Sequence, residues 1–247
     1  MVSILFLILF ILLIIVGGKR GVKTFVTFFL SLLLITIYLI FMNLGFDSIK
    51  LSIIICILSS IVSLFILNGY NLKTKSSFIS ILIVLFLIFF LVYLIGRFSN
   101  IQGFSENQME SISLYSHSIN YDMVNVIIGV YLISIIGTVV DTSISISSAM
   151  NEVYENNKKT NITDLFKSGL NIGSDILSTT INTLFFALIG GFLGFFMWYH
   201  TMIIEQMINH KVFAQDIIQL LISFIASILI IPITSYITAI TLVKKRD

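Results

Sequence analysis

The chain has 247 residues, of which 57% are hydrophobic and only 11% are charged. A soluble domain carries roughly 25% charged residues, so this composition excludes an ordinary globular domain and indicates a membrane protein. The net charge of +2 says little about partners, but the basic clusters are too short for a nucleic-acid-binding surface. The single cysteine, Cys56, excludes an intramolecular disulfide.

Long apolar runs predict an all-α, polytopic membrane protein with about seven transmembrane helices in a single membrane domain. Each run is close to the ~20 apolar residues that cross a bilayer core, and none alternates like a barrel strand. Backbone polar groups in lipid must bond within their own segment, which requires helices. The predicted spans are 2–17, 25–42, 51–67, 78–95, 124–149, 176–199 and 217–243.

Basic residues predict that the N-terminus lies outside and the C-terminus lies in the cytoplasm. With seven spans, eleven Lys and Arg residues fall on one side of the membrane and three on the other. Lys and Arg gather in cytoplasmic loops, so the eleven mark the cytoplasmic side. No basic residue precedes the first apolar run, which favours a retained span over a signal peptide. The segment 151–168 is expected to be a solvated connector; a regulatory helix is the alternative.

Two aspartates inside apolar segments, Asp141 and Asp175, are the strongest functional candidates. Helical spacing places polar residues on one face of each of three spans, 124–149, 176–199 and 217–243, which are expected to line a polar core. These faces are Gly137, Asp141, Ser145, Ser148 and Glu152; Asn171, Asp175, Ser178 and Asn182; and Ser223, Ser227, Thr234, Thr238 and Thr241. Spans 2–17 and 78–95 are nearly devoid of polar residues and are expected to face lipid or a partner.

The two aspartates are expected to lie at similar depth on antiparallel helices. No Lys or Arg lies within the predicted spans to neutralise them. Such carboxylates suit proton coupling, or a cation site with Ser145, Asn171, Ser178 and Asn182 as further ligands. The structural alternative is that the polar side chains hold helices together, and that Asp175 is a first-turn acid at a helix N-terminus.

Several other residues are expected to be structural. Gly190 and Gly194 have the spacing that allows close helix packing, with a hinge as the alternative, and Pro232 is expected to kink its span. Gly137 and Gly173 lie beside the polar positions. No catalytic residue, metal site or cofactor is predicted.

Two segments resemble the YibE/F-like family of bacterial multi-pass membrane proteins. They read GTVVDTSISISSAMNE over 137–152 and LFKSGLNIGSDILSTTINTLFFA over 165–187. The resemblance implies a permease-like protein and places Asp141, Ser145, Asn171, Gly173, Asp175, Asn182 and Thr183 at motif positions. Ser174 stands where the family commonly has a basic residue. The chain is similar to a short form without a soluble N-terminal portion, which implies a longer family member as partner, a homo-oligomer being the alternative.

Three functions compete at this point. The first is transport, with Asp141 and Asp175 as intramembrane coupling or ion-binding groups in the cell membrane. The second is a non-catalytic membrane subunit or receptor of a hetero-oligomeric complex. The third is intramembrane aspartyl proteolysis, which is disfavoured because Asp175 follows Gly173-Ser174 and no tyrosine precedes Asp141.

Overall fold

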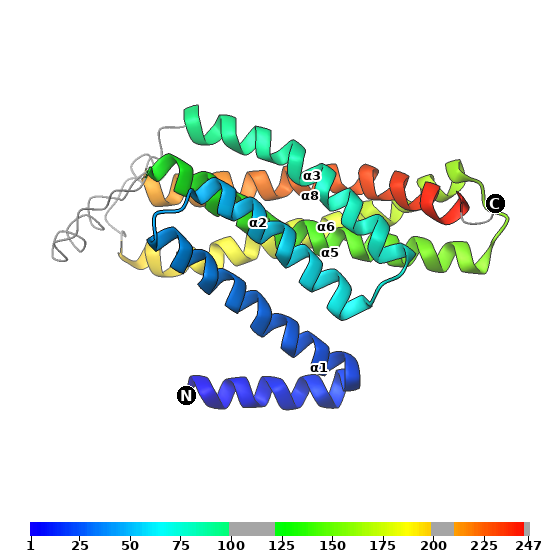
Figure 1. Ribbon diagram of the computed structural model, residues 1–247, viewed down its shortest axis with the longest axis horizontal. Coiled ribbons are helices and arrows are strands. Elements are labelled where there is room, and N and C mark those ends of the chain that lie inside the picture. Colours follow the sequence, from blue (N-terminus) through cyan, green and yellow to red (C-terminus); the bar gives the residue numbers. More distant parts are fainter. Residues whose placement is uncertain (99–121, 199–209, 245–247) are drawn as a thin grey trace.

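The computed structural model describes residues 1–98, 122–198 and 210–244, and within these ranges its regular structure is entirely helical. Six of the helices are long and apolar enough to cross a membrane. Figure 1 shows α2, α3, α5, α6 and α8 gathered in one bundle, while α1 projects away from it. The elements are α1 (Val2–Asn43), α2 (Ser48–Ile61), the π-helical continuation η1 (Val62–Ile66), α3 (Leu72–Phe98), α5 (Met123–Asn156), α6 (Ile162–Trp198) and α8 (Lys211–Lys244).

Polar side chains define where three of the helices begin. Asp47 and Asp122 are N-caps, and each carboxylate accepts hydrogen bonds from backbone N–H groups of the first turn of α2 or α5. Ahead of α3, Asn71 and Thr74 exchange reciprocal bonds of 3.1 and 3.0 Å between side chain and backbone N–H. These caps satisfy N–H groups that have no intrahelical partner.

The centre of the bundle is α8, which packs against α3, α5 and α6. Its inward face combines fully buried aliphatic side chains, such as Ala226, Ile230 and Ala239, with fully buried hydroxyl groups. On α5, Ile128, Ile135 and Ile146 are equally buried in the same core. The segment predicted as the last span therefore lies inside the bundle, as expected for a core-lining span, and together with α5 it is one of the two most enclosed helices of the described chain.

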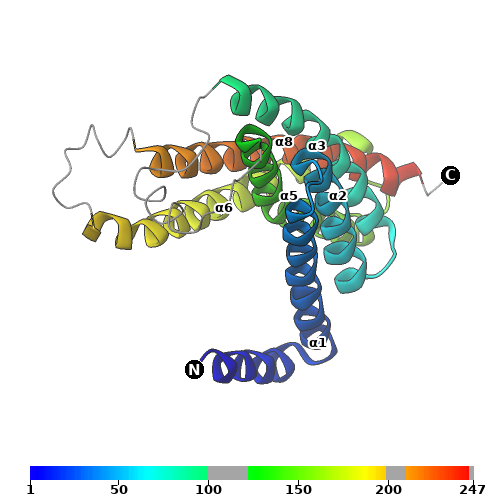
Figure 2. The ribbon, with the colours of Figure 1, turned by 60° about the vertical axis from the view of Figure 1, so that its left-hand side comes forward.

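The prediction of seven separate spans is not supported, and neither is the orientation drawn from it. The predicted spans 2–17 and 25–42 form the two arms of α1, which is kinked at Gly18, where φ is 51° and ψ is −128°. Only glycine adopts this conformation without strain. Figure 2 shows the two arms at a sharp angle, and their aromatic rings meet, with 4.6 Å between the centroids of Phe10 and Phe25.

The expected connector at 151–168 is wrong for most of its length. Helix α5 continues to Asn156 and α6 begins at Ile162, which leaves five residues between them. The apolar stretch ends sooner than the helices because Glu152, Glu155 and Asp164 carry charge into their solvated ends. Asp175 consequently lies 13 residues into α6 and is not a first-turn acid.

Two glycines let α6 approach its neighbours closely. A methyl group added at Gly169 would lie 2.6 Å from Met150 Sδ and 2.7 Å from Ser235 Oγ, and one added at Gly173 would overlap Ile231. At Gly190, by contrast, an added methyl group would meet nothing within 4 Å in the described part of the chain. Gly194 lies in α6, but the surroundings of its side-chain position are outside the description. Close packing was predicted for Gly190 and Gly194, but the structure places it at Gly169 and Gly173 instead, and Gly190 has no described neighbour within 4 Å.

Replacing Gly173 by alanine should destabilise the bundle by about 1–3 kcal/mol, because the added methyl group forces α6 away from Ile231 of α8. Gly190→Ala is the matched control and should be neutral or stabilising, since alanine is the better helix former by about 1 kcal/mol. Unfolding of both variants in mixed micelles measures the difference. Equal stability of the two variants would contradict the close α6–α8 contact.

Candidate functional site

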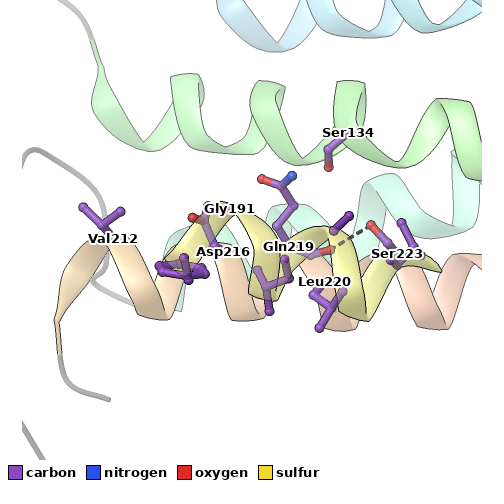
Figure 3. A pocket seen from close by; sticks show the side chains of 11 residues that line it. Ser134, Gly191, Val212, Asp216, Gln219, Leu220 and Ser223 are labelled. Atoms are coloured by element: carbon purple, nitrogen blue, oxygen red, sulfur yellow. Dashed lines mark hydrogen bonds between the residues drawn. The ribbon is translucent and has the colours of Figure 1, made fainter. Parts of the chain in front are cut away.

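A pocket of about 460 Å³ lies between α5, α6 and α8, near the end of the bundle where α8 begins. Ser134 of α5 forms one side, and Asp216, Gln219 and Ser223 of α8 form another. Figure 3 shows Gln219 extending from α8 toward Ser134, with Asp216 one turn earlier on α8. The remaining walls are mostly apolar and come from Leu184, Ala187, Leu188, Gly191, Phe192, Val212 and Leu220.

The hydroxyl groups of this pocket are oriented by their own helices. Ser134 Oγ donates to the carbonyl of Tyr131 at 2.8 Å, and Ser223 Oγ donates to the carbonyl of Gln219 at 2.8 Å. Each hydroxyl hydrogen is therefore engaged, and each oxygen keeps its lone pairs for another donor. Together with the Asp216 carboxylate, these oxygens make the polar side of the pocket rich in acceptors.

Tyr131 adds a buried phenol close to this site. Its side chain is only 1% exposed, and its hydroxyl group has no hydrogen-bond partner within the described ranges. Tyr131 stands three residues before Ser134 on α5, and its backbone carbonyl accepts the Ser134 hydroxyl. A buried hydroxyl without a partner is costly, so such groups are typical of positions where water or a ligand completes the hydrogen bonds.

Toward the opposite end, α8 contributes to a buried hydroxyl cluster shared with α3 and α5. The cluster consists of Ser76, Ser77, Ser80, Thr142, Ser143, Ser147, Thr234, Ser235 and Thr238, all at most 1% exposed. Ser77 Oγ lies 2.6 Å from Ser147 Oγ, and Ser143 Oγ lies 3.0 Å from Thr234 Oγ1. Thr238 Oγ1 donates to Ser76 Oγ at 3.2 Å. Three helices are thus joined by hydrogen bonds between side chains.

A polar stripe on α8 connects the pocket to the hydroxyl cluster. It runs along one face of the helix through Asp216, Gln219, Ser223, Ser227, Thr234 and Thr238. Between its two halves, Ala226 and Ile230 are completely buried. The polar residues thus follow one face of α8 from the pocket to the hydroxyl cluster. Within the described part of the chain no open space joins the two features, because buried aliphatic side chains fill the region between them.

The two predicted aspartates lie outside both features. Asp141 is exposed on α5, as is Gly137, while Ser145 is half-buried. By the helical rise, Asp141 and Asp175 each lie about 20 Å from the α5–α6 turn, consistent with the expected similar depth. Within the described ranges neither carboxylate takes part in a hydrogen bond or an ion pair, and the structure does not bring them into a common buried site.

Helix α6 presents its predicted polar face away from the bundle. Asn171, Asp175, Ser178 and Asn182 are all exposed, together with Ser174, Thr179 and Thr183. Gly173, which contacts α8, is two residues and therefore about 200° from Asp175 around the helix. Of the most apolar stretch of α6, only 6% is buried, against 50% for α5. A membrane-length helix thus carries an uncovered polar face.

Sequence reasoning missed Asp216, Gln219 and the α3 half of the hydroxyl cluster. The signal was present for both residues, since Asp216 and Gln219 stand seven and four residues before Ser223, on the face already predicted for the last span. Ser76 and Ser77 lie just before the predicted span 78–95, which was expected to be nearly devoid of polar groups. They belong to the same helix, because α3 begins at Leu72, six residues before the predicted span. The expectation that this span faces only lipid or a partner is wrong, since α3 packs against α5 and α8 and buries Ile81, Val84 and Ile88 there.

The helices, their lengths and their exposed apolar surfaces define a polytopic helical membrane protein. The family model of the YibE/F-like proteins matches residues 5–244, so the chain belongs to this family. The match covers α1 through α8 and includes the pocket as well as the two segments that carry the resemblance. No curated protein and no solved structure matches the chain.

Removing the bond between Ser143 and Thr234 should destabilise the protein. A double-mutant cycle with Ser143→Ala and Thr234→Val should give a coupling of about 0.6 kcal/mol, the average for hydrogen bonds between membrane helices. Unfolding in mixed micelles provides the free energies. Thr36→Val is the control, because Thr36 is exposed and donates only to its own helix, to Leu32 O at 2.9 Å. A coupling of zero would show that the bond does not join α5 to α8.

Proposed function

We propose that the chain is a permease-like protein of the cell membrane, a transporter or the membrane subunit of one, and not an enzyme. The observation that carries this proposal is the pocket between α5, α6 and α8, which holds a carboxylate and continues into the polar stripe of α8. Binding sites of transporters lie at such helix interfaces. In this state the stripe is interrupted at Ala226 and Ile230, as expected for a pathway open toward one end only.

The distribution of basic residues supports an orientation for this pathway. Lys158, Lys159 and Lys167 lie at or near the α5–α6 turn, and Lys244 lies at the end of α8, which Figure 1 shows at the same end of the bundle. Lys and Arg mark the cytoplasmic side, so this end is cytoplasmic in our proposal. The pocket, near the start of α8, then opens on the opposite, extracytoplasmic side.

Asp141 and Asp175 keep a place in this proposal as coupling groups. Carboxylates at membrane depth are costly and are functional by default. Their exposure on faces that point out of the single bundle means that they need water or another protein surface beside them. The same geometry argues against an aspartyl protease, since Asp175 points away from α8 and two catalytic carboxylates must face each other.

Single cysteines test the pathway by their reaction with a membrane-impermeant maleimide in native membranes. In a Cys56→Ser background, Ser134→Cys and Gln219→Cys should react from the extracytoplasmic side, because both positions line the pocket. Ser143→Cys should stay unlabelled, since Ser143 is completely buried in the hydroxyl cluster. Cysteine at Phe86, a 75% exposed apolar position on α3, is the lipid-facing control.

If the cysteines at both pocket positions react and the cysteine at Phe86 does not, the pocket is accessible to water. If the cysteines at Ser134 and Gln219 react with maleimide from neither side of the membrane, the transport proposal is overturned. Labelling from the cytoplasmic side alone would keep the pocket and reverse the proposed orientation.

A second candidate function, a subunit of an oligomeric complex, is favoured by the uncovered polar face of α6. We propose that a second copy of this chain covers it. Polar residues recur there at alternating steps of three and four, which is the spacing of a seam between two helices. Asn171 and Asn182 each carry donors and acceptors, so they can pair with the same residue of a symmetry-related copy. The small side chains of Ser174, Ser178 and Thr179 permit close approach.

Oxidative cross-linking tests this seam. In the Cys56→Ser background, Ser178→Cys should form a covalent dimer in membranes, because a twofold axis along the membrane normal places each residue beside its own copy. Phe86→Cys on α3 should not cross-link. Monomeric Ser178→Cys under the same oxidation would exclude the homodimer. A cross-link of Ser178→Cys to a different protein would assign the face to a heterologous partner.

A further inference from the structure

We propose that the pocket between α5, α6 and α8 binds a small organic ammonium ion that has at least one N–H donor and an apolar tail, with Asp216 as its counter-ion. The proposal deepens the transport function by naming the substrate class, and it rests on that function for its biological role. Binding itself can be measured without any transport assay.

The charge of the pocket favours a cation. Asp216 is the only charged residue among those that line it, and within residues 1–98, 122–198 and 210–244 its carboxylate has no ion-pair partner. The nearby apolar walls reduce the screening of this charge by water. An anionic solute would face repulsion from Asp216 and would find no basic side chain among the lining residues.

The hydrogen bonds select a cation that donates. The hydroxyl groups of Ser134 and Ser223 donate to the backbone carbonyls of Tyr131 and Gln219. Toward a ligand, their oxygens can therefore only accept hydrogen bonds. The Gln219 amide oxygen and the Asp216 carboxylate add further acceptors. A protonated amine supplies several N–H donors to such a site, whereas a quaternary ammonium ion supplies none.

The volume and the apolar walls of the pocket favour a ligand that carries an apolar tail. At about 460 Å³ the pocket is within the range of roughly 300–1,000 Å³ typical of small-molecule sites. Leu184, Leu188 and Phe192 of α6 face this space and can cover an alkyl or aryl group. Phe192 itself is held by an edge-to-face contact with Phe213, with 5.0 Å between ring centroids. A bare inorganic cation would leave most of this apolar surface unused.

The buried phenol of Tyr131 is the independent observation. Its hydroxyl group has no described partner, although the side chain is 99% removed from solvent. Its backbone carbonyl accepts the hydroxyl of the pocket residue Ser134 at 2.8 Å, so Tyr131 stands one turn from the pocket lining on α5. An unpartnered buried hydroxyl one turn from the pocket lining is typical of a site whose polar groups are completed by water or a ligand.

Calorimetric titration of the purified full chain in detergent tests the proposal with three probes of similar size. These are 2-phenylethylammonium, its N,N,N-trimethyl analogue and 3-phenylpropanoate. We expect the primary ammonium ion to bind at least about tenfold more tightly than the other two, because it alone supplies charge and N–H donors. Asp216→Asn should remove this preference, whereas Asp164→Asn, an exposed carboxylate in the first turn of α6, should keep it.

A second variant covers the case in which Asp216→Asn fails to fold. Ala187 lines the pocket and is exposed, so Ala187→Phe fills the space without entering the core, and it should abolish binding of the ammonium probe. Equal binding of the three probes, or an unchanged preference in Asp216→Asn or Ala187→Phe, would overturn the inference. Failure here, with Ser134 and Gln219 still accessible to maleimide, would leave transport standing. Selective binding with both positions inaccessible would instead overturn transport alone.

Discussion

The structure depends on one constraint, which is that a hydroxyl or carboxyl group removed from water must find a partner. On α8 this constraint is met by hydrogen bonds to neighbouring helices and to the backbone. Thr234 bonds to Ser143 of α5 and Thr238 to Ser76 of α3, while Ser227, nearer the start of α8, donates to its own backbone. Because α3 and α5 are also bonded to each other through Ser77 and Ser147, these contacts hold α3, α5 and α8 together as one three-helix core.

Where a polar side chain lacks a partner within the chain, a solute or another helix can supply one. The acceptors of the pocket, the phenol of Tyr131 and the polar face of α6 are unsatisfied in different ways. The pocket is concave and partly enclosed, which suits a small solute. The polar face of α6 is exposed and spans about three turns, from Asn171 to Asn182, which suits another helix. The two features therefore point to different occupants, and both can be filled at once.

The sequence was sufficient to predict helices, membrane class and family, because long apolar runs and the 137–187 motifs carry that information locally. It could not decide the first two spans, since their separation depends on a single backbone conformation at Gly18. Periodicity identified the polar face of α6 but assigned it to the interior. Which face packs is decided by Gly169 and Gly173, whose missing side chains admit Met150, Ser235 and Ile231. Asp216 escaped notice because it stands one residue before the apolar run.

Helix α6 links these features physically. One side of it supplies Leu184, Leu188 and Phe192 to the pocket, and the opposite side carries Asp175 and Asn182. Its first half is locked to α8 by the contacts of Gly169 and Gly173, whereas Gly190 and Gly191, near the pocket, have no described atom within reach of an added methyl group. A solute that displaces the second half of α6 can therefore leave Asp175 in place, because Asp175 stands two residues after Gly173 in the half that packs against α8. The pocket and the polar face of α6 can therefore be occupied independently, because the contacts of Gly169 and Gly173 hold the part of the helix that carries Asp175.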